Sequence, residues 1–345
     1  MPYIVAMSGG VDSSVSLLLA KRMLGEGALG LTLLLTGDAT DADNSRDAAL
    51  ICEKLGCGHV SVDASDAFAS KVKRYFEEEY MGGRTPNPCV VCNREIKFGL
   101  ALDWANEHGY ENIVTGHYAR VERLGEYYYI RKAAFASKDQ SYMLAMLRQD
   151  QVARARFPLG GLTKKEVREI AEENGFVNAK KGDSQDICFI PDGDYVAYLR
   201  GAVRDLPGDG DYVDMNGRVI GRHKGHICYT VGQRKGLGIS LGHQAFVVAK
   251  DAARNRVVLG YERDVFRREV RVRGLNLPSD PHALDGEVRV EAKLRYAHRA
   301  APAKFTRTGE DEGVLLFDEA VRAPSPGQFA VMYSGEYIVG AGVIE

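Results

Sequence analysis

Short apolar runs alternate with longer amphipathic stretches over the first half of the chain. Apolar or β-branched runs, each short enough for one buried strand, occupy residues 3–7, 28–35, 59–63 and 112–115. Stretches with helical character stand between them, at residues 15–24, 45–55, 66–80 and 97–108. Strands that alternate with helices build parallel sheets covered on both faces, so we predict a Rossmann-like α/β domain. Ligands of such sheets bind where the carboxyl ends of the strands meet.

The pattern changes near residue 203, where glycines become frequent and the helical stretches end. Short β-like runs separated by turn residues follow, at residues 219–221, 245–249, 256–259, 314–317 and 337–340. This spacing is typical of small β-domains or barrels. We therefore predict that residues 1–200 form the α/β domain and that residues 201–265 and 266–345 form two small, mostly-β domains.

The first predicted strand leads directly into the motif Ser8-Gly9-Gly10-Val11-Asp12-Ser13-Ser14, which precedes a helix. The free backbone N–H groups and the dipole of a helix N-terminus attract anions. Gly9 and Gly10 allow the backbone to approach a phosphate closely, and the serine hydroxyls add donors. Asp12 either caps the helix or holds a metal ion beside the phosphates. An ordinary glycine-rich turn with a serine cap is the alternative interpretation.

The motif lacks the Gly-Lys-Ser/Thr ending of a Walker P-loop. It resembles instead the pyrophosphate loop (PP-loop) of ATP pyrophosphatases. The resemblance implies that ATP is cleaved between its α and β phosphates and that an oxygen of the substrate is adenylated.

Composition limits the remaining function classes. The chain has 345 residues, 45% of them hydrophobic, and a net charge of −2, so any RNA contact must come from local patches. Two stretches fit that role, residues 222–235 with no acidic residue and residues 286–308 with six Lys/Arg against two Glu. By themselves they fit a solvated face equally well, but two basic runs in β-domains beside an adenylating domain fit contacts with a phosphate backbone better. With no export signal and no bilayer-spanning apolar run, we expect a cytoplasmic protein that has no membrane partner.

The six cysteines are therefore expected to be free, catalytic or metal-bound rather than disulfide-linked. Cys89 and Cys92 form a C-x-x-C motif between a proline turn and the predicted start of a helix. A helix N-terminus, Arg94 and Lys97 would each lower the pKa of the Cys92 thiol. Half a zinc site is the alternative, but no second cysteine pair follows. Considered alone, Cys188 is predicted to be a buried core thiol.

Six motifs occur in a fixed order along the chain: SGGVDSS, NP-x-x-x-CN-x-x-IKF, TGHYAR, KDQSY, DICFI and VGQRKGLG. Together they resemble the tRNA-specific 2-thiouridylases. The resemblance implies a PP-loop domain, a central β-domain and a C-terminal β-barrel. It also implies an enzyme that replaces O2 of the wobble uridine (U34) of tRNA with sulfur, using ATP and Mg²⁺. Its partners would be tRNAs, those for Glu, Gln and Lys, and an upstream sulfur donor such as a cysteine desulfurase or a sulfur-carrier relay. We expect a monomer.

The same resemblance implies the sulfur chemistry. Cys188 would carry a persulfide, and Cys92 would attack it so that hydrosulfide displaces AMP, or a Cys92–Cys188 disulfide would form as the sulfur leaves. Asp183 and Asp186 would assist, although an acidic turn in solvent is the simpler interpretation. Many members of the family have Asp at the position of Cys89. Related PP-loop thiolases hold a [4Fe-4S] cluster with three cysteines, so Cys89, Cys92 and Cys188 could instead be cluster ligands.

The remaining site residues follow from matching motifs. The residues expected to bind ATP are Ala6, Met7, Ser8, Gly9, Gly10, Val11, Asp12, Ser13, Leu33 and Gly116. The residues expected to contact tRNA are Asn87, Pro88, Cys89, His117, Lys138, Asp139, Gln140, Arg295, Tyr296 and Gln328. Two other function classes are weighed against the thiolase, a PP-loop synthetase that forms amides or guanidines and an RNA-binding protein without activity. The synthetase needs no paired reactive cysteines, so Cys92 and Cys188 count against it, and the retained Asp12 and later serines of the loop count against the inactive protein.

Overall fold

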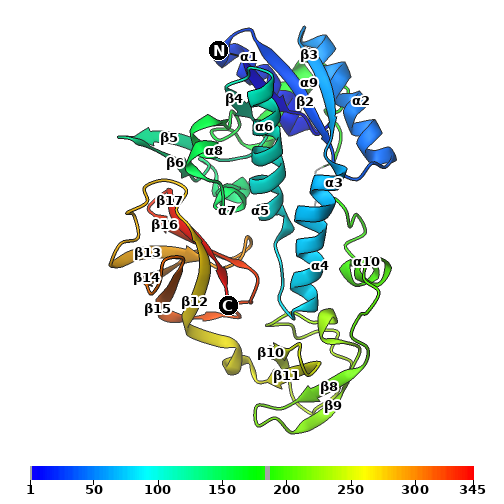
Figure 1. Cartoon of the computed structure of the whole chain (residues 1–345), viewed down its shortest axis with the longest axis vertical. Coiled ribbons are helices and arrows are strands. Elements are labelled where there is room, and N and C mark those ends of the chain that lie inside the picture. Colours follow the sequence, from blue (N-terminus) through cyan, green and yellow to red (C-terminus); the bar gives the residue numbers. More distant parts are fainter. Residues whose placement is uncertain (1, 183–186) are drawn as a thin grey trace.

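Five parallel strands form the sheet of the first domain (Figure 1). The structure is a computed structural model, and it describes residues 2–182 and 187–345. The sheet has the order β3-β2-β1-β4-β7, and its strands are β1 (Tyr3–Ala6), β2 (Ala28–Leu34), β3 (Gly58–Asp63), β4 (Asn112–Val114) and β7 (Ala155–Arg156). Every neighbouring pair is parallel, as the strand–helix alternation predicts. The carboxyl ends of β1, β2 and β4 therefore share one edge.

Helices cover both faces of this sheet. On one face, α1 (Val11–Leu24), α2 (Ala39–Lys54) and α9 (Lys164–Glu173) pack onto a core that includes Val5. On the other, η2 (Asn93–Leu100) and α6 (Ala101–Glu107) pack onto a core that includes Ile4. Neighbouring residues of a strand point to opposite faces, which is why Ile4 and Val5 belong to different cores.

The cysteine-bearing helix starts earlier than the prediction at residue 97. It begins with α5 (Pro88–Cys92) and continues through η2 into α6. Proline is favoured at the first helical position, and the side-chain oxygen of Asn87 accepts a hydrogen bond from the Val90 N–H at 3.4 Å. The predicted helix at residues 66–80 is likewise one continuous run, formed by α3 (Ser65–Phe68), η1 (Ala69–Lys73) and α4 (Arg74–Met81).

Between β4 and β7 lies a hairpin that the sequence pattern did not predict. It consists of β5 (Arg120–Leu124) and β6 (Tyr127–Arg131), and it projects from the side of the first domain in Figure 1. Three short helical segments follow it, η3 (Ala136–Lys138), α7 (Ser141–Leu144) and α8 (Gln149–Arg154). β6 pairs with the last strand of the chain, so this hairpin extends a sheet that belongs mainly to the C-terminal domain.

The central domain is small and mostly β, as predicted. After α10 (Tyr195–Ala202), four strands form a sheet in the order β10-β11-β8-β9. They are β8 (Gly210–Val213), β9 (Val219–His223), β10 (Phe246–Asp251) and β11 (Arg256–Gly260), and the short turns η4 (His226–Cys228) and η5 (Glu262–Val265) accompany them. A separate core built around Tyr212, Val247 and Leu259 holds this sheet together.

The C-terminal domain is a closed antiparallel barrel, which confirms the predicted fold class. Its strands are β12 (Phe266–Asn276), β13 (Glu287–Lys293), β14 (Ala301–Arg307), β15 (Glu312–Arg322), β16 (Phe329–Ser334) and β17 (Tyr337–Ile344). β12 pairs with both β15 and β17, and this second pairing closes the barrel. Val270 and Val272 face its core while the arginines between and beside them are exposed.

Among the helices of residues 2–182 and 187–345, none is both long enough and apolar enough to cross a membrane.

Candidate active site

The loop between β1 and α1 has the geometry of an anion site. Gly10 is the N-cap of α1, so the first N–H groups of the helix have no partner within it. Gly9 has φ +66°, and a Cβ there would lie 2.6 Å from the carbonyl oxygen of Asn44, so only glycine fits. The hydroxyls of Ser13 and Ser14 donate to the Gly10 carbonyl at 2.9 and 3.1 Å. These two serines therefore shape the loop, whereas Ser8 stays exposed.

Two side chains from a distant segment brace this loop. The amide nitrogen of Asn178 donates to the Gly9 carbonyl at 3.0 Å and to the Ser14 hydroxyl at 2.9 Å. Lys181 donates to the Gly9 carbonyl at 3.4 Å and pairs with Asp47 at 3.0 Å. The sequence motifs did not point to either residue, because both lie more than a hundred residues from the loop and match no local pattern.

Asp12 does not take the first of the two roles that the sequence suggested, and its carboxylate is already paired within the protein. It does not cap the helix, because Gly10 occupies the cap position and Asp12 already lies in the first turn. Both carboxylate oxygens accept hydrogen bonds from the Lys164 ammonium, at 2.8 and 2.9 Å, and one also accepts a bond from the Tyr118 hydroxyl at 2.8 Å. A carboxylate that already accepts these three hydrogen bonds is poorly suited to bind Mg²⁺, so we assign no metal ion to Asp12. Lys164 instead brings a positive charge to the loop.

The ends of the neighbouring strands complete this edge. Ala6 and Leu33 lie in β1 and β2, and Gly116 follows β4, where a Cβ would meet the first turn of α1 at 3.0 Å. The predicted ATP residues are thus brought together at the carboxyl edge. His117 pairs through Nδ1 with the Thr115 hydroxyl at 2.8 Å, and burial lowers the pKa of His117 to about 3. His117 is therefore neutral at physiological pH.

The structure brings Cys92 and the segment that carries Cys188 close together. Cys92 is buried, with 6% of its surface exposed, in a small apolar cluster with Phe68. Phe189 packs against that cluster, and its ring meets the Phe68 ring edge-on with centroids 5.6 Å apart. Cys188, the neighbour of Phe189, is exposed rather than buried in a core, so that prediction is wrong. Cys89 is also exposed, on the turn of α5 before Cys92.

The expected low pKa of Cys92 is also wrong. Cys92 lies one turn inside the continuous helix that begins at Pro88, and burial raises its pKa to about 12. The protein surroundings raise the pKa of Cys89 and Cys188 as well. The Lys97 ammonium acts in the opposite direction on all three thiols. Lys97 is therefore the cation that opposes the effect of burial here.

The three cysteines do not fit a shared metal cluster in this arrangement. Within the two stretches that the structure describes, no group of three or more His, Cys, Asp or Glu side chains is placed to hold a metal ion. We therefore give a [4Fe-4S] cluster no part in the proposed reaction. Asp183 and Asp186, which were expected to assist Cys188, lie outside the described residues.

Several expected tRNA contacts serve the protein's own structure. Asn87 and Pro88 form the start of α5. The Asp139 carboxylate accepts bonds from the N–H and hydroxyl of Ser141, at 3.2 and 2.8 Å, and the Gln140 side chain accepts a bond from the Tyr118 N–H at 2.9 Å. Lys138 is half-buried in η3.

The expected contacts in the barrel divide in the same way. Arg295 is half-buried and bonds the carbonyls of Val231 and Ala323 at 3.0 and 3.1 Å. Gln328 bonds two backbone carbonyls of the first domain. Tyr296 is 38% exposed, and the Lys293 ammonium lies 5.3 Å from the centre of its ring. Tyr296 is therefore the member of this group that faces solvent, and sequence reasoning missed the half-buried Lys293 beside it.

The two basic stretches are partly neutralised. Ion pairs join Arg222 to Asp211, Arg289 to Asp318 and Lys304 to Glu287. Such exposed pairs contribute little to stability and exchange readily with phosphate, so they neither require nor exclude an RNA surface.

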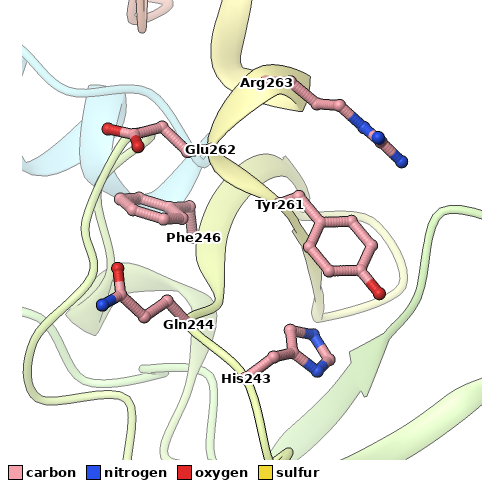
Figure 2. Close-up of a pocket in the computed structure, with 6 residues that line it drawn as sticks. All are labelled: His243, Gln244, Phe246, Tyr261, Glu262 and Arg263. Atoms are coloured by element: carbon pink, nitrogen blue, oxygen red, sulfur yellow. The ribbon is translucent and has the colours of Figure 1, made fainter.

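A separate hollow of about 560 Å³ lies in the central domain (Figure 2). The His243 ring stacks on Tyr261 with centroids 4.8 Å apart, and the Arg263 guanidinium lies 5.2 Å from the Tyr261 ring centre. Gln244, Phe246 and Glu262 line the rest of it. The β10–β11 region lies at the opposite end of the molecule from β1 and β2 in Figure 1, so we do not assign this hollow to adenylation.

Three domain families match successive parts of the chain. Residues 1–192 match the tRNA methyl transferase HUP domain, residues 197–261 the tRNA methyl transferase PRC-barrel domain, and residues 267–344 the aminomethyltransferase beta-barrel domain. The tRNA-specific 2-thiouridylase MnmA of Treponema denticola is 40% identical over 364 residues, which span 100% of this chain and 98% of the relative. The chain belongs to the tRNA-specific 2-thiouridylase family.

A second 2-thiouridylase, MnmA 1 of Caldanaerobacter subterraneus subsp. tengcongensis, is 42% identical over 355 residues, which span 99% of this chain and 97% of the relative. As a member of the 2-thiouridylase family, the chain is a tRNA sulfurtransferase with a PP-loop domain. The synthetase and the inactive RNA-binding protein are thereby set aside.

Among solved structures, the U34-tRNA thiolase NcsA from Methanococcus maripaludis with its [4Fe-4S] cluster is 16% identical. The match covers 59% of this chain and 66% of that chain with a TM-score of 0.37, which is too low to carry an argument about the 2-thiouridylase mechanism.

Proposed function

We propose that this 2-thiouridylase acts on the wobble uridine of tRNA in two steps, of which the first is adenylation. The uracil C2 carbonyl is a poor electrophile, and its oxygen is a poor leaving group. Attack of O2 on the α-phosphorus of ATP releases pyrophosphate and converts that oxygen into part of AMP, which leaves easily. The free N–H groups at the start of α1 are suited to hold the negative charge of the phosphates, and the Lys164 ammonium, which pairs with Asp12, lies beside them. Mg²⁺ would add charge neutralisation when bound with ATP.

The second step transfers sulfur. A persulfide on Cys188, supplied by a sulfur-donor protein, carries the terminal sulfur. The Cys92 thiolate attacks the Cys188 Sγ, forming a disulfide, and the terminal sulfur leaves with the bonding electrons as hydrosulfide. Hydrosulfide adds to C2, AMP leaves with its electron pair, and the proton on sulfur is released. A thiol reductant must then reduce the disulfide before the next turnover.

One observation carries this proposal. Phe189 packs into the apolar cluster that holds Cys92, so the chain brings the residue next to it, Cys188, to the helix that carries Cys92. Cys188 is exposed and can meet a donor, whereas Cys92 is buried and protected from solvent. This difference in exposure matches an acceptor of sulfur and an internal nucleophile.

The cysteine variants test both steps separately. We expect Cys92→Ser and Cys188→Ser to abolish thiolation of tRNA while tRNA-dependent exchange of pyrophosphate into ATP continues. Cys228→Ser, which changes a half-buried cysteine of the central domain, should behave as the wild type in both assays. Wild-type thiolation by either of the first two variants would contradict the sulfur step.

Protein purified without oxygen tests the route through a cluster. If sulfur moves through the proposed Cys188 persulfide, the active protein should lack visible absorption and contain no stoichiometric iron. Iron at a stoichiometric level, together with activity that is lost when iron is chelated, would favour the cluster instead.

For the tRNA, we propose that the exposed Tyr296 and the half-buried Lys293 beside it meet the anticodon arm, by stacking and by phosphate contact. The expected substrates are the tRNAs for Glu, Gln and Lys. Thiolation of purified tRNAs, each measured by itself, tests this set.

A further inference from the structure

The turn that precedes β16 lies directly against the segment that leads into the cysteine-bearing helix. The Thr85 N–H donates to the Pro326 carbonyl at 2.7 Å. The side-chain nitrogen of Gln328 donates to the carbonyls of Thr85 and Pro86, at 2.8 and 3.1 Å. Pro86 is followed by Asn87, the N-cap of α5. A residue of the barrel therefore holds the backbone immediately before the helix that presents Cys89 and Cys92.

Gln328 has no donor left for RNA in this arrangement. A side-chain amide carries two N–H groups, and two carbonyl acceptors lie within reach of this nitrogen. The reverse orientation would place the amide oxygen against two carbonyl oxygens, so the assignment of nitrogen and oxygen is fixed by the surroundings. The resemblance that predicts a tRNA contact at Gln328 does not account for these bonds.

The surroundings show that this joint is closely fitted. Gly327 has φ +89°, and a Cβ there would lie 2.9 Å from the Thr85 nitrogen and 3.0 Å from a carboxylate oxygen of Glu79. Glu79 is buried and forms a two-bond ion pair with Arg84, at 2.8 and 2.7 Å. Paired charges and a glycine with no room for a side chain leave this contact little freedom to shift.

The turn is also supported from behind. Arg295 bonds the Ser325 hydroxyl and the Ala323 carbonyl, just before Pro326. On the other side, the ring nitrogen Nε2 of His226, in the central domain, lies 3.1 Å from the Met81 carbonyl oxygen. Both β-domains therefore contact residues 79–87, the stretch that ends at the start of α5.

We propose that Gln328 is a positioning residue for sulfur transfer, which holds the start of α5 so that Cys92 faces its partner. The inference rests on the proposed role of Cys92. Loss of the two hydrogen bonds loosens residues 85–86 and lets the helix start fray, because α5 is the first turn of the continuous helix and its first N–H groups have no partner within that helix. Gln328 acts in the enzyme without tRNA, and this separates it from a tRNA contact.

The experiment compares three variants of the full chain. Gln328→Met removes both donors and adds no charge. Gln328→Lys keeps a donor group that can reach both carbonyls. Gln244→Met changes an exposed glutamine of the central domain and serves as the matched control. For each, kcat and KM for tRNA are measured, together with the rate at which iodoacetamide modifies each cysteine in the enzyme without tRNA.

For Gln328→Met we expect kcat to fall about tenfold or more while KM for tRNA stays within about twofold. Modification of Cys92 should become several-fold faster, while Cys52, which is fully buried, stays unmodified and shows that the domain is folded. Gln328→Lys should restore kcat and the slow modification of Cys92, and Gln244→Met should leave both quantities unchanged. If Gln328→Met also exposes Cys52, Gln328→Asn replaces it, since the shorter amide cannot reach both carbonyls.

A rise in KM with unchanged modification of Cys92 would overturn the proposal and identify Gln328 as a tRNA contact. The modification assay does not depend on thiolation. It therefore still reports on the joint if the variant Cys92→Ser remains active and the proposed sulfur step fails.

Discussion

Lys97 is the residue on which the reactivity of the thiols depends most directly. Its positive charge lowers the pKa of Cys89, Cys92 and Cys188, whose surroundings otherwise raise it. A thiol reacts as its thiolate, so with a pKa near 12 for Cys92 the rate should rise with pH throughout the neutral range. Negative tRNA phosphates near this site would raise the pKa of the thiols and so oppose the effect of the Lys97 charge.

We expect Lys97→Met to slow sulfur transfer at fixed pH and to shift the pH profile to higher pH. The sign follows from charge: without the ammonium, the thiolates lose a stabilising partner and their pKa values rise further. The rate of Cys92 modification, measured across the pH range, gives the shift directly. Lys71→Met removes a half-exposed lysine that pairs with Glu95, so its profile should match the wild type.

At the scale of single residues, the sequence predicted which residues carry the chemistry better than it predicted which residues contact them. Gly9 and the cysteines stand in recognisable motifs. Lys164 and Asn178 reach the PP-loop from segments far along the chain, and no local pattern marks them. The pKa of Cys92 was predicted with the wrong sign because burial, which only the packed structure reveals, outweighs the nearby positive charge.

At the scale of elements, the loop between β1 and α1 depends on one backbone conformation. Gly9→Ala would add a Cβ 2.6 Å from the Asn44 carbonyl oxygen in a backbone with φ +66°. We expect a loss of stability of about 1 kcal/mol or more and a marked rise in KM for ATP. Gly10→Ala, whose Cβ would meet only the Ser8 hydroxyl at 3.4 Å, should keep its stability within about 0.5 kcal/mol. Thermal unfolding and pyrophosphate exchange measure the two effects, and equal stability of the two variants would contradict the argument.

Helix and strand periodicity predicted the parallel sheet and the change to β-domains, but not every boundary. The helix with Cys92 starts at Pro88 because Asn87 caps it, whereas the proline and the C-x-x-C suggested a turn there. The hairpin β5–β6 was missed because its sequence, with Tyr127, Tyr128 and Tyr129, lies inside a predicted α/β region. It becomes a strand pair by joining the barrel sheet, which is a long-range effect.

At the scale of the whole molecule, the first domain and the barrel share one core. Phe329, Tyr333 and Ile338 of the barrel belong to the apolar cluster that contains Ile4 and Ile113 of the sheet. The Tyr142 hydroxyl donates to the Phe329 carbonyl at 3.0 Å within that cluster. The order of domains was readable from composition, whereas this shared core was not, because it depends on how the domains pack.

We expect Tyr333→Ala to destabilise the first domain as well as the barrel, by about 3 kcal/mol or more. Trp104 of α6 is the single tryptophan, so its fluorescence reports on the first domain during denaturant unfolding. Ser334→Ala, at an exposed position of the same strand, should leave the midpoint unchanged. An unchanged Trp104 transition in Tyr333→Ala would show that the two domains unfold independently.

The joint between Gln328 and residues 85–86 has a consequence for biosynthesis. A ribosome releases the first domain well before the turn at Pro326 and the strand β17, which closes the barrel against β12. The start of the cysteine helix thus lacks its outer support until translation is nearly finished. A nascent or prematurely ended chain that stops before β16 lacks this support and also the barrel's share of the common core. The last residues to be made would then act as a completeness check on the enzyme.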